Sequence, residues 1–412
     1  MQHRKTLAAV AVAATSAIAL AGCAGGSTDG GDAKVTMWIY PVIADEAAHS
    51  SYWDGLIASY EKANPGVEVD YEIYPWANRD ESLQTAIAAG KGPDLVYLIP
   101  DQLSSYASSI EPMDAYLPAE QADDILPNVR DSITIDGSLM GTPLLTSANA
   151  LMCDRSAFEK AGITDYPKTW DDLMEMAPTF KQNDIYTTQY FGSPEVTLNM
   201  TFYPLLWQAG GSVFSDDGSE VAFDGPEGVA ALTYLTELAQ NDYLEPDLIS
   251  TMPALEQTAL ATGQVACTWQ SGPADVASYW GEDNIEILPP LTDEESVSYG
   301  TVGSLAMLKG AQDKEAAGAF AAYATDADNV KAFDLASNYF SPLASTGELY
   351  ADDPIQSAIE DVIPTSRVGE LYPGAREVMG VLAPEIQAAL LGTKTPEQAL
   401  KDAAAAAEPL LG

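Results

Sequence analysis

Residues 35–40 (VTMWIY), 67–73 (VEVDYEI) and 94–99 (DLVYLI) carry the clearest indication of the fold of this chain. Each stretch has the apolar or alternating pattern of a β-strand, and the last suits a strand that is buried on both faces. Between them, apolar side chains recur at helical spacing over residues 52–60 and 83–87. Strand, helix, strand, helix and strand in about 65 residues form a βαβαβ unit, which implies a parallel sheet with right-handed crossovers. The predicted fold class is therefore α/β.

The rest of the chain continues this alternation over a length that suggests more than one domain. The chain has 412 residues, and a domain commonly holds about 150, so two to three domains are expected. Thr169 and Thr395 each have the sequence context of a helix N-cap. Ala-rich stretches over 313–325 and 326–337 predict two further helices.

Composition excludes several classes of function. The chain carries 18 Lys and Arg against 61 Asp and Glu, a net charge of −43, so binding to nucleic acid or a polybasic grip on anionic lipid is not expected. Hydrophobic residues make up 47%, which is enough for a globular core. Only His3 and His49 are histidines, so a His-based triad or His-rich metal site is nearly ruled out, and His49 is predicted to be solvated.

The N-terminus has the pattern of an export signal. His3-Arg4-Lys5 is a basic start, and residues 7–20 form an Ala/Val-rich run of about 14 residues, too short for a comfortable transmembrane helix of about 20. Leu20-Ala21-Gly22-Cys23 resembles the bacterial lipobox. The resemblance implies that residues 1–22 are removed and that Cys23 carries acyl chains such as palmitate, which anchor the protein on the outer face of the cell membrane. Residues 23–34 then have the composition of a flexible tether.

Two cysteines remain in the body of the chain. Cys153 and Cys267 lie in apolar, strand-like runs (ALMC and QVACTW). They could pair in an oxidising exterior, but two buried free thiols are the favoured interpretation.

Polar and aromatic residues follow the three predicted strands. Tyr40 ends the first, Trp76 follows the second, and Asp101 and Gln102 follow the third. Parallel α/β sheets bind ligands at the carboxyl ends of their strands. Aromatic faces with a carboxylate and an amide suit a sugar, whose C–H faces lie on rings and whose hydroxyls need hydrogen-bond partners.

The sequence offers no catalytic apparatus. No GxSxG elbow, HExxH, P-loop or CxxC is present, and neither a cofactor nor a metal is expected. With 61 acidic residues, a pair of carboxylates at glycosidase separation would occur by chance. The protein is therefore predicted not to be an enzyme. A secreted glycoside hydrolase remains the alternative from another functional class.

Several ordered segments resemble the extracellular solute-binding proteins of carbohydrate ABC transporters, which are related to maltodextrin-binding proteins. They are YEKANPGVEVDYE (60–72), AIAAGKGPDLVYLIPDQLSSYA (86–107), GTPLLTSANALMCDRSAFEKAG (141–162), PKTWDDL (167–173), PLLWQAGGSVF (204–214), ALATGQVACTWQSGP (259–273) and SPLAST (341–346). The resemblance implies two α/β lobes joined by a hinge, with the ligand in the cleft between them. The first lobe would take residues 35–148 and 300–345, and the second 149–299 and 346–412.

The resemblance also assigns further contacts with the ligand. It places Ser147 and Asn149 at the crossover between lobes, and Tyr203 as the stacking aromatic of the second lobe. Trp269 and Gln270 would end a strand at the cleft, while Arg376 would lie in the cleft or form a surface salt bridge. The full set of predicted ligand-binding residues is Tyr40, Trp76, Asp101, Gln102, Ser147, Asn149, Tyr203, Trp269, Gln270 and Arg376.

Some residues depart from the family pattern or are assigned to packing. Leu98 stands where maltodextrin binders have an aromatic, and Met379 is not aromatic, which argues against a maltodextrin but not against a sugar. Trp53, Trp170 and Trp207 are predicted to be core residues.

The sequence therefore predicts a monomeric, lipid-anchored binding protein that hands a carbohydrate, expected to be an oligosaccharide, to an ABC permease. A non-sugar solute such as a polyol, polyamine or iron chelate is the alternative on the same scaffold.

Overall fold

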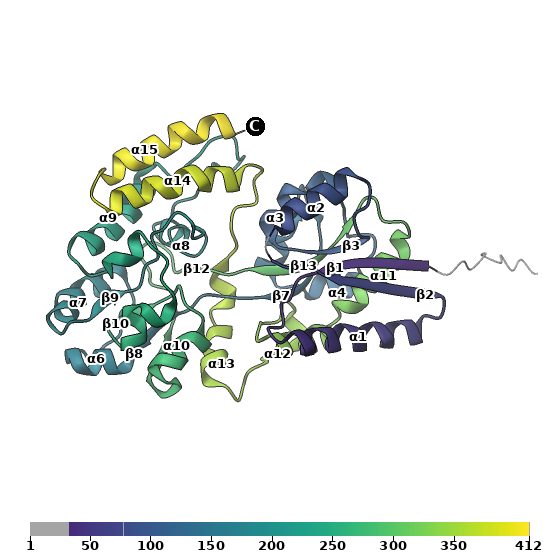
Figure 1. Cartoon of the computed structure of the whole chain (residues 1–412), viewed down its shortest axis with the longest axis horizontal. Coiled ribbons are helices and arrows are strands. Elements are labelled where there is room, and N and C mark those ends of the chain that lie inside the picture. The colour runs from purple at the N-terminus through teal and green to yellow at the C-terminus, as the bar shows by residue number, and fades with distance from the viewer. Residues whose placement is uncertain (1–32, 77, 412) are drawn as a thin grey trace, which may run out of the picture.

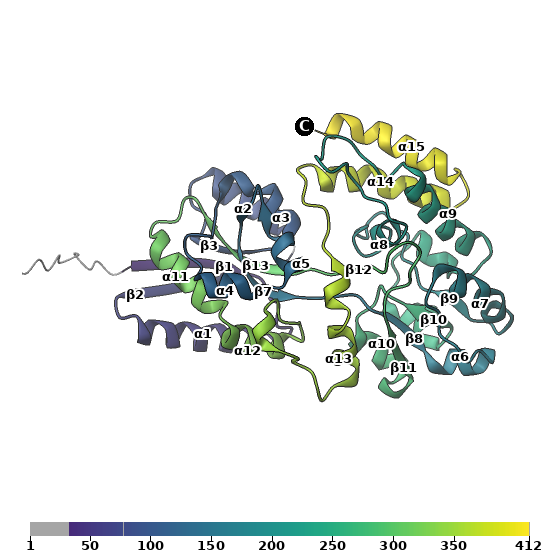
Figure 2. The same cartoon turned by 180° about the vertical axis from the view of Figure 1, so that it is seen from behind.

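The computed structural model describes residues 33–76 and 78–411 of the chain, which form two lobes (Figures 1 and 2). The signal segment and Cys23 lie outside the described residues. Three connections between the lobes are visible in both views: one runs from β7 to β8, one from β12 to β13, and one passes through α13 toward α14.

The first lobe is built on a sheet of order β2-β1-β3-β13-β4, with β7 paired to β13. Its strands are β1 (Ala33–Ile39), β2 (Val67–Ile73), β3 (Leu95–Leu98), β4 (Ile110–Glu111), β7 (Thr142–Thr146) and β13 (Val302–Leu308). Its helices are α1 (Glu46–Ala63), α2 (Arg79–Ala88), α3 (Pro100–Ser105), α4 (Ala119–Asp124), α5 (Pro127–Ser132), α11 (Lys314–Ala324) and α12 (Ala327–Ser337). Helices α1 and α12 lie on one side of this sheet, and α2 and α3 lie on the other (Figure 1).

The predicted βαβαβ unit is confirmed by the pairing of its strands. β1 runs parallel to β2, with Val35 opposite Val69, and parallel to β3, with Met37 opposite Leu95. The sheet as a whole is mixed, however, because β13 returns from the far end of the chain and pairs antiparallel with β3, β4 and β7. The carboxyl ends of β1, β2 and β3 still meet at one edge, where Tyr40, Trp76 and Asp101 follow them.

The second lobe holds a sheet of order β11-β8-β10-β9. Its strands are β8 (Leu151–Asp154), β9 (Tyr186–Thr188), β10 (Val265–Thr268) and β11 (Ile285–Leu288), and its helices are α6 (Arg155–Ala161), α7 (Trp170–Gln182), α8 (Tyr203–Gln208), α9 (Pro226–Gln240), α10 (Pro273–Trp280), α14 (Ala375–Leu390) and α15 (Pro396–Ala407). Thr169 caps α7 in a capping box with Asp172, and Thr395 accepts a hydrogen bond from the Gln398 amide at the start of α15, so both predicted caps are confirmed.

Short elements complete the fold around the connections. They are the pair β12 (Ser298–Tyr299) and β14 (Ser366–Arg367), the pair β5 (Thr134–Ile135) and β6 (Ser138–Leu139), and helix α13 (Pro354–Glu360). A small apolar cluster that includes Ala148, Phe340 and Tyr350 packs beside the crossing segments.

A disulfide joins Cys153 of β8 to Cys267 of β10, so the prediction of two free thiols is wrong. The two residues lie directly opposite each other in the antiparallel ladder, and both are fully buried. They are 114 positions apart in the chain, and only the pairing of the two strands brings them together.

His49 is buried, so the prediction that it is solvated is also wrong. It lies in the first turn of α1, and its Nδ1 accepts a hydrogen bond from the Ile43 amide at 3.4 Å. Burial lowers the pKa of His49. The three tryptophans predicted to be core residues, Trp53, Trp170 and Trp207, are buried as expected.

Candidate functional site

Trp76 and Tyr40 form a stacked aromatic pair at the carboxyl edge of the first-lobe sheet. Their ring centroids lie 5.1 Å apart with an interplanar angle of 23°. Trp76 is 41% exposed, whereas Tyr40 is buried beneath it, and burial raises the pKa of Tyr40 to about 12. The Arg79 guanidinium lies 5.1 Å from the centre of the Trp76 ring. Tyr40 therefore supports the Trp76 ring, and it is Trp76 that offers an accessible aromatic surface.

The two polar residues after β3 have different roles. Gln102 is buried, and its amide nitrogen donates to Asp80 Oδ1 at 2.6 Å while its oxygen accepts from the Ile99 amide at 3.2 Å. Gln102 is thus committed to holding Asp80, which corrects the expectation that it contacts a ligand directly. Asp101, by contrast, keeps one carboxylate oxygen, Oδ1, buried and without a hydrogen-bond partner among the described residues.

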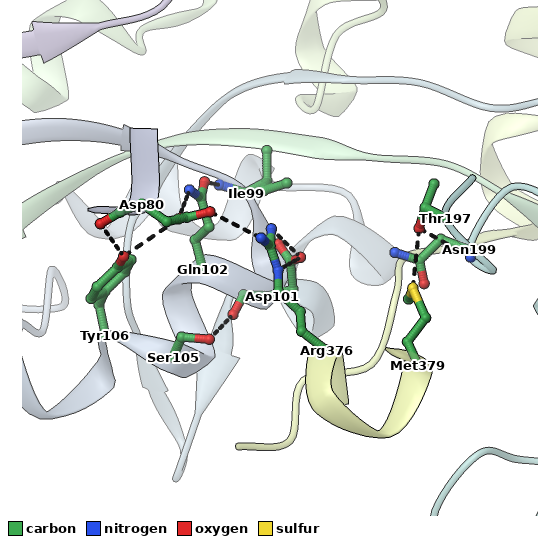
Figure 3. Close-up of polar contacts among 10 residues, drawn as sticks. All are labelled: Asp80, Ile99, Asp101, Gln102, Ser105, Tyr106, Thr197, Asn199, Arg376 and Met379. Atoms are coloured by element: carbon green, nitrogen blue, oxygen red, sulfur yellow. Dashed lines mark hydrogen bonds and ion pairs between the residues drawn. The ribbon is translucent and has the colours of Figure 1, made fainter. Parts of the chain in front are cut away.

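Arg376, at the start of α14, points from the second lobe to two carboxylates of the first (Figure 3). Its Nη2 lies 2.7 Å from Asp101 Oδ2, its Nε donates to the same oxygen at 2.9 Å, and its Nη1 lies 2.9 Å from Asp80 Oδ2. Burial lowers the pKa of Arg376, but the charges and hydrogen bonds of Asp101 and Asp80 outweigh that effect, and the pKa is raised overall. The two lobes are therefore bridged by charge at this point.

The crossover residues Ser147 and Asn149 tie the connecting segments to one another. The Ser147 hydroxyl accepts a hydrogen bond from the Thr301 amide at 3.0 Å. Asn149 donates from its backbone amide to the Tyr299 carbonyl at 2.8 Å and from Nδ2 to the Trp269 carbonyl at 3.2 Å. These bonds hold the first crossing segment against the second and against the end of β10.

Trp269 and Gln270 follow β10 and carry two buried donors. The Trp269 Nε1 and the Gln270 Nε2 have no hydrogen-bond partner within the described part of the chain. Gln270 is held in place because its Oε1 accepts from the Phe191 amide at 2.7 Å. Buried donors of this kind are rare in proteins and mark candidates for binding a polar ligand.

Tyr203 does not reach the surface, which contradicts its prediction as a stacking residue. Every residue of α8 (YPLLWQ) is buried, because the helix is apolar on nearly all sides and lies inside the core of the second lobe. The Tyr203 ring lies 6.1 Å from the Trp207 ring and is fully enclosed. It presents no free face to a ligand in this structure.

A cavity of about 370 Å³ opens beside the charge bridge, between the two lobes. Asp101 lines it from the first lobe, and Thr197, Asn199, Arg376 and Met379 line it from the second. This volume lies within the range of about 300–1,000 Å³ that is typical of small-molecule sites. Asn199 is nine-tenths buried, and its Oδ1 has no partner among the described residues. A smaller cavity of about 20 Å³ beneath Trp269 has room for about one water molecule.

Sequence reasoning missed Asp80, Arg79, Thr197 and Asn199. Asp80 stands in the acidic first turn of α2, four residues after Trp76, and that position just beyond a strand end was an available signal. Nothing local to Thr197 or Asn199 marks them, because the segment that carries them has neither strand nor helix periodicity. Within residues 33–76 and 78–411, no group of three or more His, Cys, Asp or Glu side chains is arranged to hold a metal ion.

Comparison with known proteins identifies the family. Residues 44–331 match the family of bacterial extracellular solute-binding proteins, which is well over half of the chain, and the chain therefore belongs to that family. The resemblance predicted from the sequence is confirmed. Among the described helices, none is both long and apolar enough to cross a membrane.

Three relatives illustrate the similarity. The maltotriose-binding protein of Pyrococcus abyssi is 24% identical over 325 residues, which are 76% of this chain and 67% of that protein. An ABC transporter solute-binding protein of Thermotoga lettingae, solved with α-D-tagatose, is 25% identical with a TM-score of 0.73 and covers 92% of this chain and 100% of its own. The cyclic α-maltosyl-1,6-maltose-binding protein of Arthrobacter globiformis is 20% identical, covers 92% of this chain and 99% of its own, and has a TM-score of 0.79. The two-lobed fold is thus shown.

Proposed function

We propose that this protein is the lipid-anchored substrate-binding component of an ABC importer, and that it captures a carbohydrate between its lobes and delivers it to the permease. The observation that carries the proposal is the Trp76 ring, which is 41% exposed and backed by Tyr40 at the sheet edge where α/β proteins bind ligands. The names of the relatives, which bind maltotriose, tagatose and a cyclic maltosyl-maltose, support a sugar.

The polar groups around the cleft favour a neutral, hydroxyl-rich ligand over an ionic one. Arg376 is paired with both Asp80 and Asp101, so it offers no free positive charge to an anionic ligand, and this cluster disfavours an anion. Among the described residues, the groups without partners there include two acceptors, Asp101 Oδ1 and Asn199 Oδ1, and the donors of Trp269 and Gln270. Sugar hydroxyls both donate and accept hydrogen bonds, and therefore complement such a mixed set.

A thermal-shift screen against mono-, di- and oligosaccharides tests the ligand class. A ligand at about 100 times its dissociation constant should stabilise the protein by about 2.7 kcal/mol, which is an easily measured shift. No stabilisation by any sugar, together with stabilisation by a polyamine or an iron chelate, would refute the carbohydrate assignment. Chromatography of the bound sugar after a long incubation should show it unchanged, whereas released reducing ends would indicate a glycoside hydrolase.

The anchor rests on the lipobox-like segment that ends at Cys23, followed by the Gly-rich tether. Replacing Cys23 by Ala should abolish labelling of the protein with a radioactive fatty acid and release it from the membrane fraction. Labelling that persists in this variant would overturn the anchoring part of the proposal while leaving ligand binding untouched.

A further inference from the structure

Arg376 contacts two residues that lie far away in the chain and on the other lobe. It is 275 positions from Asp101 and 296 positions from Asp80. The guanidinium donates through both Nε and Nη2 to one oxygen of Asp101, Oδ2, and makes a separate contact to Asp80 through Nη1 (Figure 3). Arg presents its donors in a planar fork, and one side chain can therefore engage both carboxylates at once.

Contacts within the first lobe position the Asp80 carboxylate independently of Arg376. Gln102 donates to Asp80 Oδ1 at 2.6 Å, and the Tyr106 hydroxyl reaches the same oxygen at 3.4 Å. Because Oδ1 is occupied in this way, Asp80 Oδ2 is left to face the second lobe. Gln102 is itself buried and fixed by the Ile99 amide, so the acceptor geometry belongs to the first lobe alone.

The position of Arg376 in its own helix is electrostatically unfavourable. It lies in the first turn of α14, where the helix dipole favours acidic side chains and disfavours basic ones. Arg376 therefore does not stabilise α14 by its charge. Its favourable electrostatic interactions are the ion pairs with Asp80 and Asp101 of the other lobe. The Asp101 side chain is only 16% exposed, so its ion pair with Arg376 is screened by solvent less than a surface pair would be.

We propose that Arg376, Asp80 and Asp101 form an interlobe latch, which favours the arrangement seen in this structure, in which these contacts join the lobes (here called closed), over one in which the lobes lie apart, whether or not a ligand is present. The latch raises ligand affinity by increasing the fraction of molecules in the binding-competent arrangement, and Arg376 acts as a positioning residue. The apparent dissociation constant is the intrinsic one divided by that fraction. The inference rests on the two-lobed fold and on these contacts, and holds for any ligand class.

Small-angle X-ray scattering of the mature chain tests the latch without any ligand. The protein is first unfolded and refolded to strip bound solute. Arg376→Ala should then have a larger radius of gyration than the parent, with a closed-to-open ratio lowered about tenfold, which corresponds to about 1.4 kcal/mol. Arg376→Lys keeps the charge and should recover part of the compaction. The double variant Asp80→Asn with Asp101→Asn should open the lobes in the same way from the other side.

Arg155→Ala is the matched control. Arg155 pairs with Glu286 at 2.6 Å within the second lobe, and its side chain is 45% exposed, as is that of Arg376. This variant loses an arginine ion pair without touching the connection between lobes, so its radius of gyration should equal that of the parent.

The proposal is overturned if Arg376→Ala and the parent have the same radius of gyration without ligand at low salt. In that case Arg376 contributes only by touching the ligand, and its loss would appear solely in a binding titration. This result would leave the carbohydrate proposal intact. Conversely, a latch that opens as expected in a protein that no sugar stabilises would preserve the latch and refute the carbohydrate.

Discussion

Replacing Trp76 by Ala should weaken ligand binding about 60-fold. A fully buried Trp removes up to about 250 Å² of surface from water. Trp76 is 41% exposed, so a ligand stacked on the ring can cover about 100 Å² more. At about 25 cal/mol per Å² this burial is worth about 2.5 kcal/mol, and each 1.4 kcal/mol is a factor of ten in affinity.

Isothermal titration with the sugar that the screen identifies measures the loss. Trp76→Phe keeps a smaller ring over Tyr40 and should lose less affinity than Trp76→Ala. Tyr279 is a suitable control because it is 38% exposed and lies on α10, which is outside the candidate site. Tyr279→Ala should bind as tightly as the parent. If Trp76→Ala also binds within about twofold of the parent while its melting temperature is unchanged, the aromatic pair is not the binding platform.

Three further predictions concern stability. Replacing Cys153 and Cys267 by Ser, or reducing the protein, should lower the free energy of unfolding of the second lobe by about 2–4 kcal/mol, because the disulfide joins residues 114 positions apart. An unchanged denaturant midpoint under reducing conditions would contradict this. The parent should lose stability as the pH falls from about 7 to 5. In the unfolded chain His49 takes up a proton near pH 6.5, whereas burial lowers the pKa of His49 in the fold and so disfavours its protonation there. The urea midpoint of His49→Gln should therefore fall less than that of the parent over this range. Asp334 is fully buried with neither carboxylate oxygen hydrogen-bonded among the described residues, and burial raises its pKa well above the usual value, so the fold favours its protonated form at pH values where the unfolded chain ionises. This residue should cost the parent up to about 1.4 kcal/mol per pH unit above about pH 4, and Asp334→Asn should remove that dependence; equal pH profiles for the two proteins would refute it.

The cleft region was partly predictable because its first-lobe components follow strands in sequence. Tyr40 ends one predicted strand, Trp76 and Asp101 follow the other two within three residues, and parallel pairing carries all three to one edge. The same argument could not predict which side chains at that edge of the sheet are exposed and which are buried. Gln102 stands beside Asp101 in the chain, yet it is buried against Asp80, because the turn into α3 points neighbouring side chains in different directions.

Hydrophobic periodicity, capping side chains and segments along the chain were enough to predict the local elements and the family. The βαβαβ unit follows from hydrophobic periodicity, the caps at Thr169 and Thr395 follow from side chains that bond amides within one turn, and the family follows from segments spread along the chain. The Cys153–Cys267 disulfide and the approach of Arg376 to Asp80 and Asp101 are apparent only in the folded chain. Those contacts join positions from 114 to 296 residues apart. They depend on how strands pair and how two lobes meet across a hinge, and short-range residue patterns carry no information about either.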